Sequence, residues 1–521
     1  MSLTRFSFLL LILLPILSSG FPIHKISLTE ATIDELQFAF RHNKLTSRQL
    51  VQFYLERIHR LNPKLRGVIE VNPEALFLGD KADHERRIKA PISFSKLHGI
   101  PILVKDNIAS KDKLNTTAGS FALLGSVVPR DAGVVAKLRK AGAIILGKAS
   151  LSEWSYFRSN LAPSGWNGRA GQGVNPYNTL QIPCGSSSGS AISAAANLAA
   201  VTLGTETDGS ILCPSSLNSV VGIKPTVGLT SRAGVVPISP RQDSVGPICR
   251  TVSDAAYVLD VIAGIDKYDS DTTAASKYIP KGGYAQFLRR NGLKGKRIGI
   301  VRFPFFEFGN FTSAAKTSRQ HLNTLRKEGA VLIDNLEISN INEISSGLSE
   351  HIASTAEFKI ALNKYLSELV TSPVRSLADV IDFNNKHPKL EKVKEYGQNI
   401  LLEAEKTKGF GNAEKAALAK LATLTEKGFV KLMTKYKLDA LVALGGANFP
   451  FPDVQQILAI GGFPGITIPA GYIAGTGFIN YDGLPFGIIF GGLRGSEPKL
   501  IEIAYAFEQA TKVRKPPTLF K

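Results

Sequence analysis

Residues 183–191 read PCGSSSGSA and residues 204–211 read GTETDGSI, and these two stretches decide how the fold is interpreted. The first is a loop of glycines and serines that leads into an alanine-rich helix, expected over residues 191–200. Such a loop exposes backbone N–H groups and can hold hydroxyls in unusual conformations. The second follows an apolar strand expected over residues 200–203, which leaves Ser210 at the end of a strand. Neighbouring N–H groups at such a place can form an oxyanion hole.

Each of these features has an ordinary explanation when it is taken alone. A Gly/Ser loop is also typical of a turn that caps a helix, or of a phosphate-binding loop. The phosphate-binding loop is disfavoured because no Lys-Ser or Lys-Thr pair follows the glycines. Lys105 follows an apolar strand expected over residues 100–104, and a lysine there usually marks a strand end at the surface. A catalytic interpretation therefore depends on the features occurring together.

Strands and helices alternate along much of the chain. Two capping boxes, at residues 32–35 and 46–49, predict a pair of helices at the start of the mature protein. Apolar runs predict further strands at residues 143–146, 220–223, 298–301, 440–444, 465–468 and 486–490. Strands that alternate with helices predict an α/β fold, in which helices cover the faces of a sheet.

A single domain is expected over residues 21–521, because no linker, repeat or low-complexity tract divides the chain. The core motifs, including those that could take part in catalysis, fall at residues 98–250 and 440–510. Residues 268–426 are richer in Lys and Glu and are predicted to be mostly helical. This region is interpreted as a peripheral layer or an insertion that covers the substrate.

The order of these motifs resembles the amidase signature family. A lysine after a strand comes first, then a Gly-Ser-Ser loop, then a serine after a strand, and Ser186 and Ser210 are 24 residues apart as in that family. The resemblance covers roughly residues 28–510. Flanking text agrees with it: HGIP at 98–101, TTAGS at 116–120, GK at 147–148, GIKPT at 222–226, GITIPAG at 465–471 and GLPFG at 483–487.

The resemblance implies a catalytic triad of Lys105, Ser186 and Ser210, with a cis peptide bond between Gly185 and Ser186. It implies an oxyanion hole made by the backbone N–H groups of Thr207, Asp208, Gly209 and Ser210. Ser187 is expected to support the lysine by hydrogen bonding from behind the triad. It also implies that the domain is one large, mixed, twisted β-sheet covered by helices on both faces.

Such a triad is chemically reasonable for a serine hydrolase. A serine hydroxyl is a poor nucleophile until a base takes its proton. Lysine serves as that base only when neutral, and burial lowers its pKa towards the working range. Neither a metal nor a cofactor is expected, because the eight histidines show no metal-ligand spacing. The expected activity is hydrolysis of a linear amide through an acyl-enzyme on Ser210.

The substrate is less closely defined than the reaction. Cys184 and Ser188 replace glycines of the family's usual loop, and Asp208 replaces a glycine beside the nucleophile. Asp208 resembles the branch that includes peptide amidases and plant relatives. The preferred substrate is therefore a small amide or the C-terminal amide of a peptide, and a fatty-acid amide is the alternative. A glutamyl-tRNA amidotransferase-like subunit is the rival of another class.

The N-terminus predicts entry into the secretory pathway. Arg5 precedes an apolar run at residues 8–17 that is shorter than the roughly 20 residues that span a bilayer. Small residues follow it, so residues 1–20 are interpreted as a cleaved signal peptide of a secreted, extracellular or vacuolar protein. The rival intracellular subunit is disfavoured on this ground. Two Asn-x-Thr sequons, at Asn115 and Asn310, agree with a secreted glycoprotein.

The net charge and the number of cysteines further limit what kind of protein this is. The chain has a formal net charge of +19, yet its Lys and Arg are scattered, which disfavours a nucleic-acid binder. Adhesion to anionic wall or matrix polymers is the preferred explanation of the charge. The three cysteines, Cys184, Cys213 and Cys249, allow at most one disulfide, so a large core must supply the stability.

Overall fold

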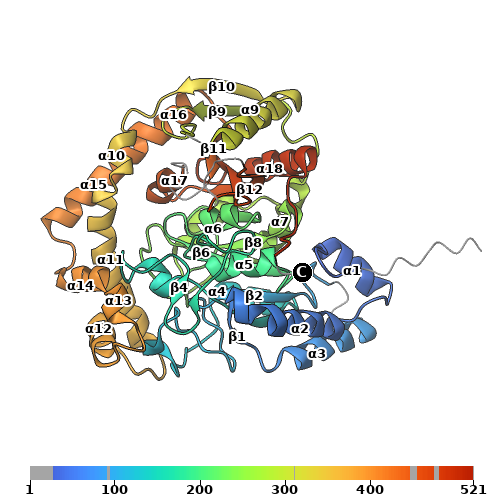
Figure 1. Ribbon diagram of the computed structural model, residues 1–521, viewed down its shortest axis with the longest axis vertical. Helices are drawn as coiled ribbons and strands as arrows, with labels where there is room; N and C mark the ends of the chain where they lie inside the picture. Colours follow the sequence, from blue (N-terminus) through green and yellow to red (C-terminus); the bar gives the residue numbers. More distant parts are fainter. Residues whose placement is uncertain (1–26, 91–93, 310, 446–453, 475–479, 520–521) are drawn as a thin grey trace, which may run out of the picture.

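An eleven-stranded mixed sheet forms the centre of the molecule, in the order β1-β3-β2-β6-β8-β7-β12-β13-β11-β9-β10 (Figure 1). The computed structural model describes residues 27–90, 94–309, 311–445, 454–474 and 480–519. The strands are β1 (Val68–Val71), β2 (Pro101–Lys105), β3 (Ile144–Ala149), β6 (Val201–Glu206), β7 (Val221–Lys224), β8 (Ser244–Cys249), β9 (Arg297–Val301), β10 (Val331–Leu336), β11 (Ala440–Gly445), β12 (Gly465–Tyr472) and β13 (Pro485–Gly491). A separate hairpin joins β4 (Trp166–Asn167) to β5 (Gly171–Gln172).

Parallel and antiparallel pairs are combined in this sheet. Strand β2 lies between β3 and β6 and is parallel to both, and β9 is parallel to β10 and β11. Strands β8, β7, β12 and β13 pair antiparallel in the middle. The α/β class and the mixed sheet predicted from the sequence are therefore confirmed.

Both faces of the sheet are buried, as the alternation of side chains along β11 demonstrates. Val442 and Leu444 belong to the main core cluster, which includes residues of α9 and α18. Leu441 and Ala443 point the other way, into a second cluster with residues of α15 and α17. Successive side chains of a strand point to opposite faces, so apolar residues at every position of β11 require a cover on both sides.

The helices fall into three groups along the chain. The N-terminal group is α1 (Ile33–Arg41), α2 (Ser47–Leu65) and α3 (Ala75–Ile88). The helices that pack on the sheet are α4 (Gly133–Lys140), α5 (Ser188–Ala195), α6 (Leu212–Leu217), α7 (Val252–Ile262), α9 (Thr312–Lys327), α17 (Gln455–Gly461) and α18 (Glu497–Thr511), with the short α8 (Asp271–Ala275) beside them. Both predicted capping boxes are present, at Thr32 and at Thr46.

A flank of helices lies along one side of the molecule and is coloured yellow and orange in Figure 1. It comprises α10 (Ile341–Ser345), α11 (Leu348–Glu368), α12 (Leu377–Lys386), α13 (Val393–Tyr396), α14 (Asn399–Lys406), α15 (Asn412–Thr425), the π-helical turn Glu426–Val430 and α16 (Lys431–Lys435). The predicted helical region, residues 268–426, contains this flank as far as α15, and the flank continues beyond it through the π-helical turn and α16. It also contains the edge strand β10, which the sequence analysis missed, because at the sheet edge its side chains are mostly part-exposed and include Asp334 and Asn335.

Other differences from the sequence expectations have local causes. Strand β8 was missed because Gly246 and Pro247 interrupt its apolar pattern. Helix α5 begins earlier than expected, within the serine loop, and ends before Asn197, whose φ of 58° is left-handed. No helix within the described ranges is long and apolar enough to cross a membrane. The predicted signal peptide at residues 1–20 and the sequon at Asn310 lie outside the described residues.

Candidate active site

The sheet brings together the two sequence segments that end in Lys105 and Ser210. Lys105 is the last residue of β2, and β6 ends four residues before Ser210. These strands are parallel neighbours, so their carboxyl ends meet at the same edge of the sheet. In open α/β sheets, ligands bind outside that edge. Ser186 reaches the same place from the loop that precedes α5.

Lys105 is fully buried, and three hydrogen bonds hold its ammonium group. Its Nζ donates to Ser186 Oγ at 2.6 Å and to Thr205 Oγ1 at 2.8 Å. A third bond runs to the Thr205 carbonyl at 3.2 Å. Burial lowers the pKa of Lys105 to about 7, against the opposing effect of the carboxylates of Glu206 and Asp243. A substantial fraction of this lysine is therefore neutral near pH 7.

Thr205 is a site residue that the sequence analysis did not single out. Its hydroxyl also accepts a hydrogen bond from Asn107 Nδ2 at 3.0 Å. Ser187 Oγ donates to the Thr205 carbonyl at 3.0 Å, and the Thr205 N–H donates to Ser187 Oγ at 3.2 Å. Ser187 thus acts on the lysine through Thr205. The available signal was the position of Thr205 at the end of β6, beside the strand that ends in Lys105.

Ser210 is the most exposed member of the predicted triad. Its exposed fraction is 8%, against 1% for Ser186 and 0% for Lys105. The Ser187 N–H donates to the Ser210 carbonyl at 3.2 Å, which joins the loop of residues 207–210 to the serine loop. Gly209 has a φ of +71°, and a Cβ there would lie 2.0 Å from Gln455 Oε1. The positive φ favours glycine before Ser210, and a larger residue would also have to displace the Gln455 amide.

Side chains on both sides hold the loop of residues 207–210. Thr207 Oγ1 donates to Asp243 Oδ1 at 2.5 Å, and the Thr207 carbonyl accepts from Gln242 Nε2 at 3.2 Å. Beneath the loop, the buried Glu206 carboxylate accepts the N–H groups of Ile211 and Leu212 at 2.6 and 2.9 Å. Burial raises the pKa of Glu206, and the N–H of Gly209, one of the four predicted oxyanion-hole donors, acts against that rise.

A disulfide between Cys184 and Cys213 ties the serine loop to α6. Cys249 is free and buried. The Gly185–Ser186 peptide is cis, as the resemblance implied. The Ser186 carbonyl accepts the N–H of Ser152 at 2.9 Å, which anchors the loop from the other side.

The flanking motifs form a buried scaffold behind the lysine. Asp106, next to Lys105, accepts hydrogen bonds from the Thr117 hydroxyl and from the Gly119 N–H. Lys148 donates to the Ile108 carbonyl at 2.5 Å and to Thr116 at 2.9 Å. Burial lowers the pKa of Lys148 to about 8. These polar groups hold the segment after β2 in place.

Comparison with known proteins gives a consistent result. A family model described as Amidase matches residues 49–501. The chain is 59% identical over 493 residues to a probable amidase of Arabidopsis thaliana, covering 94% of this chain and 92% of that protein. It is 32% identical over 504 residues to a glutamyl-tRNA(Gln) amidotransferase subunit of Thermoanaerobacter pseudethanolicus, covering 93% and 97% of the two chains. The structure is similar to that of native peptide amidase from Stenotrophomonas maltophilia, with a TM-score of 0.86, 42% identity and coverage of 94% and 99%.

Proposed function

The chain belongs to the amidase signature family and is a hydrolase of carbon–nitrogen bonds in linear amides, and from this premise we propose that it acts through an acyl-enzyme on Ser210. The observation that carries the proposal is the contact of 2.6 Å between the buried Lys105 Nζ and Ser186 Oγ. Lys105 is the base, Ser186 the proton relay and Ser210 the nucleophile. The pKa of Lys105, about 7, supports the role of a neutral base.

In the acylation step, Ser210 Oγ attacks the amide carbon while its proton passes to Ser186 Oγ. The Ser186 proton passes at the same time to the Lys105 amine, which becomes an ammonium. The negative charge on the carbonyl oxygen is stabilised by backbone N–H groups of Thr207, Asp208, Gly209 and Ser210.

Collapse of the tetrahedral intermediate breaks the C–N bond and leaves the acyl group esterified to Ser210. The proton returns from Lys105 through Ser186 to the leaving nitrogen, which departs as a neutral amine or ammonia. A water molecule then attacks the ester and is deprotonated along the same path. Ser187 maintains the geometry by holding Thr205, the second acceptor of the lysine.

We propose the C-terminal carboxamide of a peptide, or a small amide, as the substrate. The similarity to a peptide amidase at 42% identity over 94% of this chain supports it. A fatty-acid amide is the alternative within the same reaction. The similarity to an amidotransferase subunit is the argument for a partner-dependent role, and the secretory signal predicted at residues 1–20 is the argument against it.

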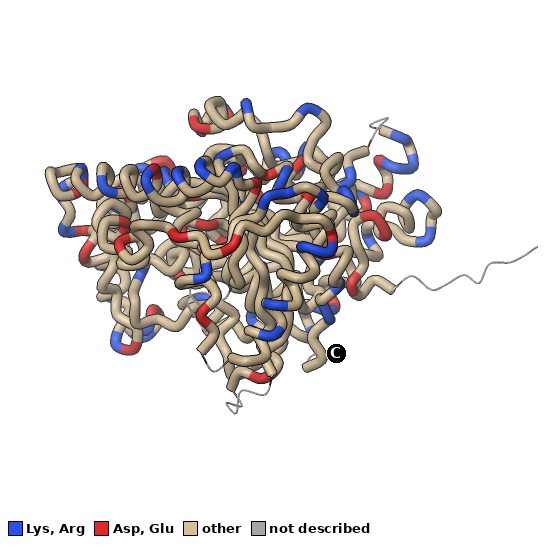
Figure 2. The backbone as a smooth tube through the Cα atoms, turned by 90° about the horizontal axis from the view of Figure 1, so that it is seen from above, with Lys and Arg blue, Asp and Glu red and all other residues tan. Residues whose placement is uncertain are grey.

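We further propose that the protein is secreted and adheres to anionic wall or matrix polymers. Along the backbone drawn in Figure 2, positions of Lys and Arg alternate with positions of Asp and Glu. One local concentration of lysines supports adhesion. Lys427, Lys431 and Lys435 line a hollow of about 280 Å³, and Glu337 is the acidic residue of its lining. Spaced four apart, these lysines face the same way. Retention on a polyanion column should fall with added salt, and more steeply for the native protein than for the triple Lys→Gln variant.

Labelling with a fluorophosphonate probe tests the nucleophile directly. The purified protein is treated with the probe, and the modified peptide is located by mass spectrometry. A label on Ser210 that is lost in Ser210→Ala supports the proposal, and a label on another serine contradicts it. Peptide amides, aryl amides and fatty amides assayed side by side then separate the substrate classes. Hydrolysis of glutamine only in the presence of a partner protein would favour the rival function.

A further inference from the structure

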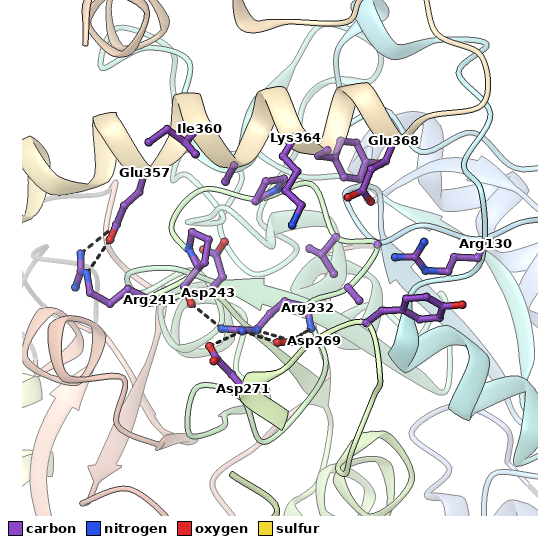
Figure 3. A pocket seen from close by; sticks show the side chains of 18 of the residues that line it. Arg130, Arg232, Arg241, Asp243, Asp269, Asp271, Glu357, Ile360, Lys364 and Glu368 are labelled. Carbon is purple, nitrogen blue, oxygen red and sulfur yellow. Dashed lines mark hydrogen bonds and ion pairs between the residues drawn. The ribbon is translucent and has the colours of Figure 1, made fainter. Parts of the chain in front are cut away.

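A cavity of about 570 Å³ lies between helix α11 and the loops at residues 232–243 and 268–271 (Figure 3). Helix α11 forms its roof through residues spaced along one face, from Glu357 to Glu368. The cavity is large enough for several amino-acid residues, within the usual range of ligand sites. None of the three triad residues lines it.

Three exposed apolar side chains from distant parts of the sequence converge on this cavity. Tyr268 is 55% exposed, Ile360 46% and Phe410 41%, and all three line it. Scattered single apolar residues are normal on a protein surface. Convergence of three of them on one hollow is typical of a binding site instead.

The charged lining consists of ion pairs, two cations outside those pairs, and the carboxylates of Asp243 and Glu368. Arg232 is paired with Asp269 and Asp271, and Arg241 with Glu357, so these pairs build the walls. Arg130 and Lys364 also line the cavity, and within the part of the chain that the structure describes neither has a carboxylate partner. Both side chains project into the hollow in Figure 3. The Arg130 guanidinium lies 3.9 Å from the centre of the Tyr268 ring, which positions it.

One hydrogen bond connects the cavity wall to the loop of residues 207–210. Asp243 lines the cavity, and its Oδ1 accepts the Thr207 hydroxyl at 2.5 Å. Thr207 is three residues before Ser210, and three residues of chain reach at most about 11 Å. With the length of the two contacting side chains added, an extended peptide of about five residues covers the path from Ser210 to the cavity.

We propose that this cavity binds the part of a peptide amide that precedes the cleaved carboxamide, and that Arg130 and Lys364 select an acidic side chain there. The inference rests on the proposed function, and it names the substrate class more closely. An acidic residue supplies the carboxylate that the two cations lack, while neighbouring apolar residues pack on Tyr268 and Ile360. A fatty acyl chain fits poorly, because it would remove these cations from water without pairing them.

The test uses peptide amides that differ at one position. Matched sets carry Glu, Gln or Lys at the second to fifth residue before the carboxamide, and kcat/KM is measured for each. The wild-type protein should prefer Glu to Gln by about three- to tenfold at one of these positions, the size expected for two partly exposed ion pairs. This Glu/Gln ratio should decrease with added salt. It should fall to about one in the double variant Arg130→Gln/Lys364→Gln, and Lys364→Glu should shift the preference towards Lys.

The double variant Lys316→Gln/Arg319→Gln is the matched control. It removes two exposed cations from α9, away from the cavity, and so changes the net charge equally. Its Glu/Gln ratio should equal that of the wild type. A wild-type ratio of one at every position, or an unchanged ratio in Arg130→Gln/Lys364→Gln, overturns the inference while the proposed function stands. Failure of the wild type to hydrolyse any peptide amide overturns the inference, and failure on small amides as well overturns the proposed function.

Discussion

The Nζ of Lys105 lies 2.6 Å from Ser186 Oγ, although 81 residues separate them in the sequence. The lysine is fully buried and its nearest acceptors are hydroxyls and a carbonyl rather than a carboxylate. Carboxylate partners would stabilise the ammonium form, whereas these neutral acceptors leave the cost of burial largely uncompensated. This environment makes the lysine suitable as a base.

Replacement of Ser210, the proposed nucleophile, tests the reaction most directly. Ser210→Ala should reduce kcat on any accepted amide by about a thousandfold or more, because no acyl-enzyme can form. The fold should be retained, since only one hydroxyl near the surface is lost. Steady-state kinetics and the thermal unfolding midpoint are compared with those of Ser345→Ala, an exposed serine of α10. Activity near the wild-type level would contradict the assignment.

The pH profile should report the lysine. The folded pKa of Lys105 is about 7, so the base is neutral above that pH and protonated below it. The value of kcat/KM should therefore rise through about pH 7 and fall roughly tenfold for each pH unit at lower pH. Lys105→Arg keeps the charge but loses the base, because guanidinium does not deprotonate in proteins. An active Lys105→Arg enzyme would mean that another group transfers the proton.

Thr205 should act as a positioning residue for the lysine. Thr205→Val removes the hydroxyl that accepts hydrogen bonds from Lys105 and Asn107, so each of these buried donors loses one acceptor. A loss of about ten- to hundredfold in kcat/KM is expected. Loss of an acceptor disfavours the ammonium form, so the acidic limb of the pH profile should move to lower pH. Thr202→Val, the same change earlier on β6, should leave that limb in place.

The disulfide should stabilise the site as well as the fold. The bridge between Cys184 and Cys213 closes a loop with a sequence separation of 29 residues. Its loss should lower the free energy of unfolding by about 3 kcal/mol by loop-closure entropy. The serine loop loses its tether to α6, so activity should also fall at temperatures below the unfolding midpoint. Cys184→Ala/Cys213→Ala is compared with Cys249→Ala, and equal behaviour of the two would contradict this prediction.

The two sequons should differ in occupancy on secreted protein. The Asn115 side chain is already engaged, since its Nδ2 donates to Glu70 at 3.0 Å and its Oδ1 accepts the Gly125 N–H at 3.1 Å. A glycan on this nitrogen would disrupt the contact with Glu70. We expect Asn310 to carry the glycan instead. Glycopeptide mass spectrometry decides, and a glycan on Asn115 with none on Asn310 would reverse the order.

The sequence by itself determined the family, the α/β class and the residues with catalytic potential. These features can be read along a single stretch of the sequence: apolar strands alternate with helices, and Ser186 and Ser210 have a fixed spacing. The pattern of apolar residues in a segment reflects how that segment is hydrogen-bonded and buried. For the same reason both N-terminal capping boxes could be recognised. Strands β8 and β10 could not, because Pro247 breaks the pattern of one and exposure at the sheet edge weakens that of the other.

Only the tertiary structure decided which distant groups meet. The order of β2 and β6 in the sheet brings Lys105 to Thr205, 100 residues away in the chain. Cys213 rather than Cys249 became the partner of Cys184 for the same kind of reason. The cavity is the extreme case, since Arg130, Tyr268 and Lys364 share no sequence pattern. Such contacts depend on strand order and helix packing, which arise from burial across the whole chain rather than from any one segment.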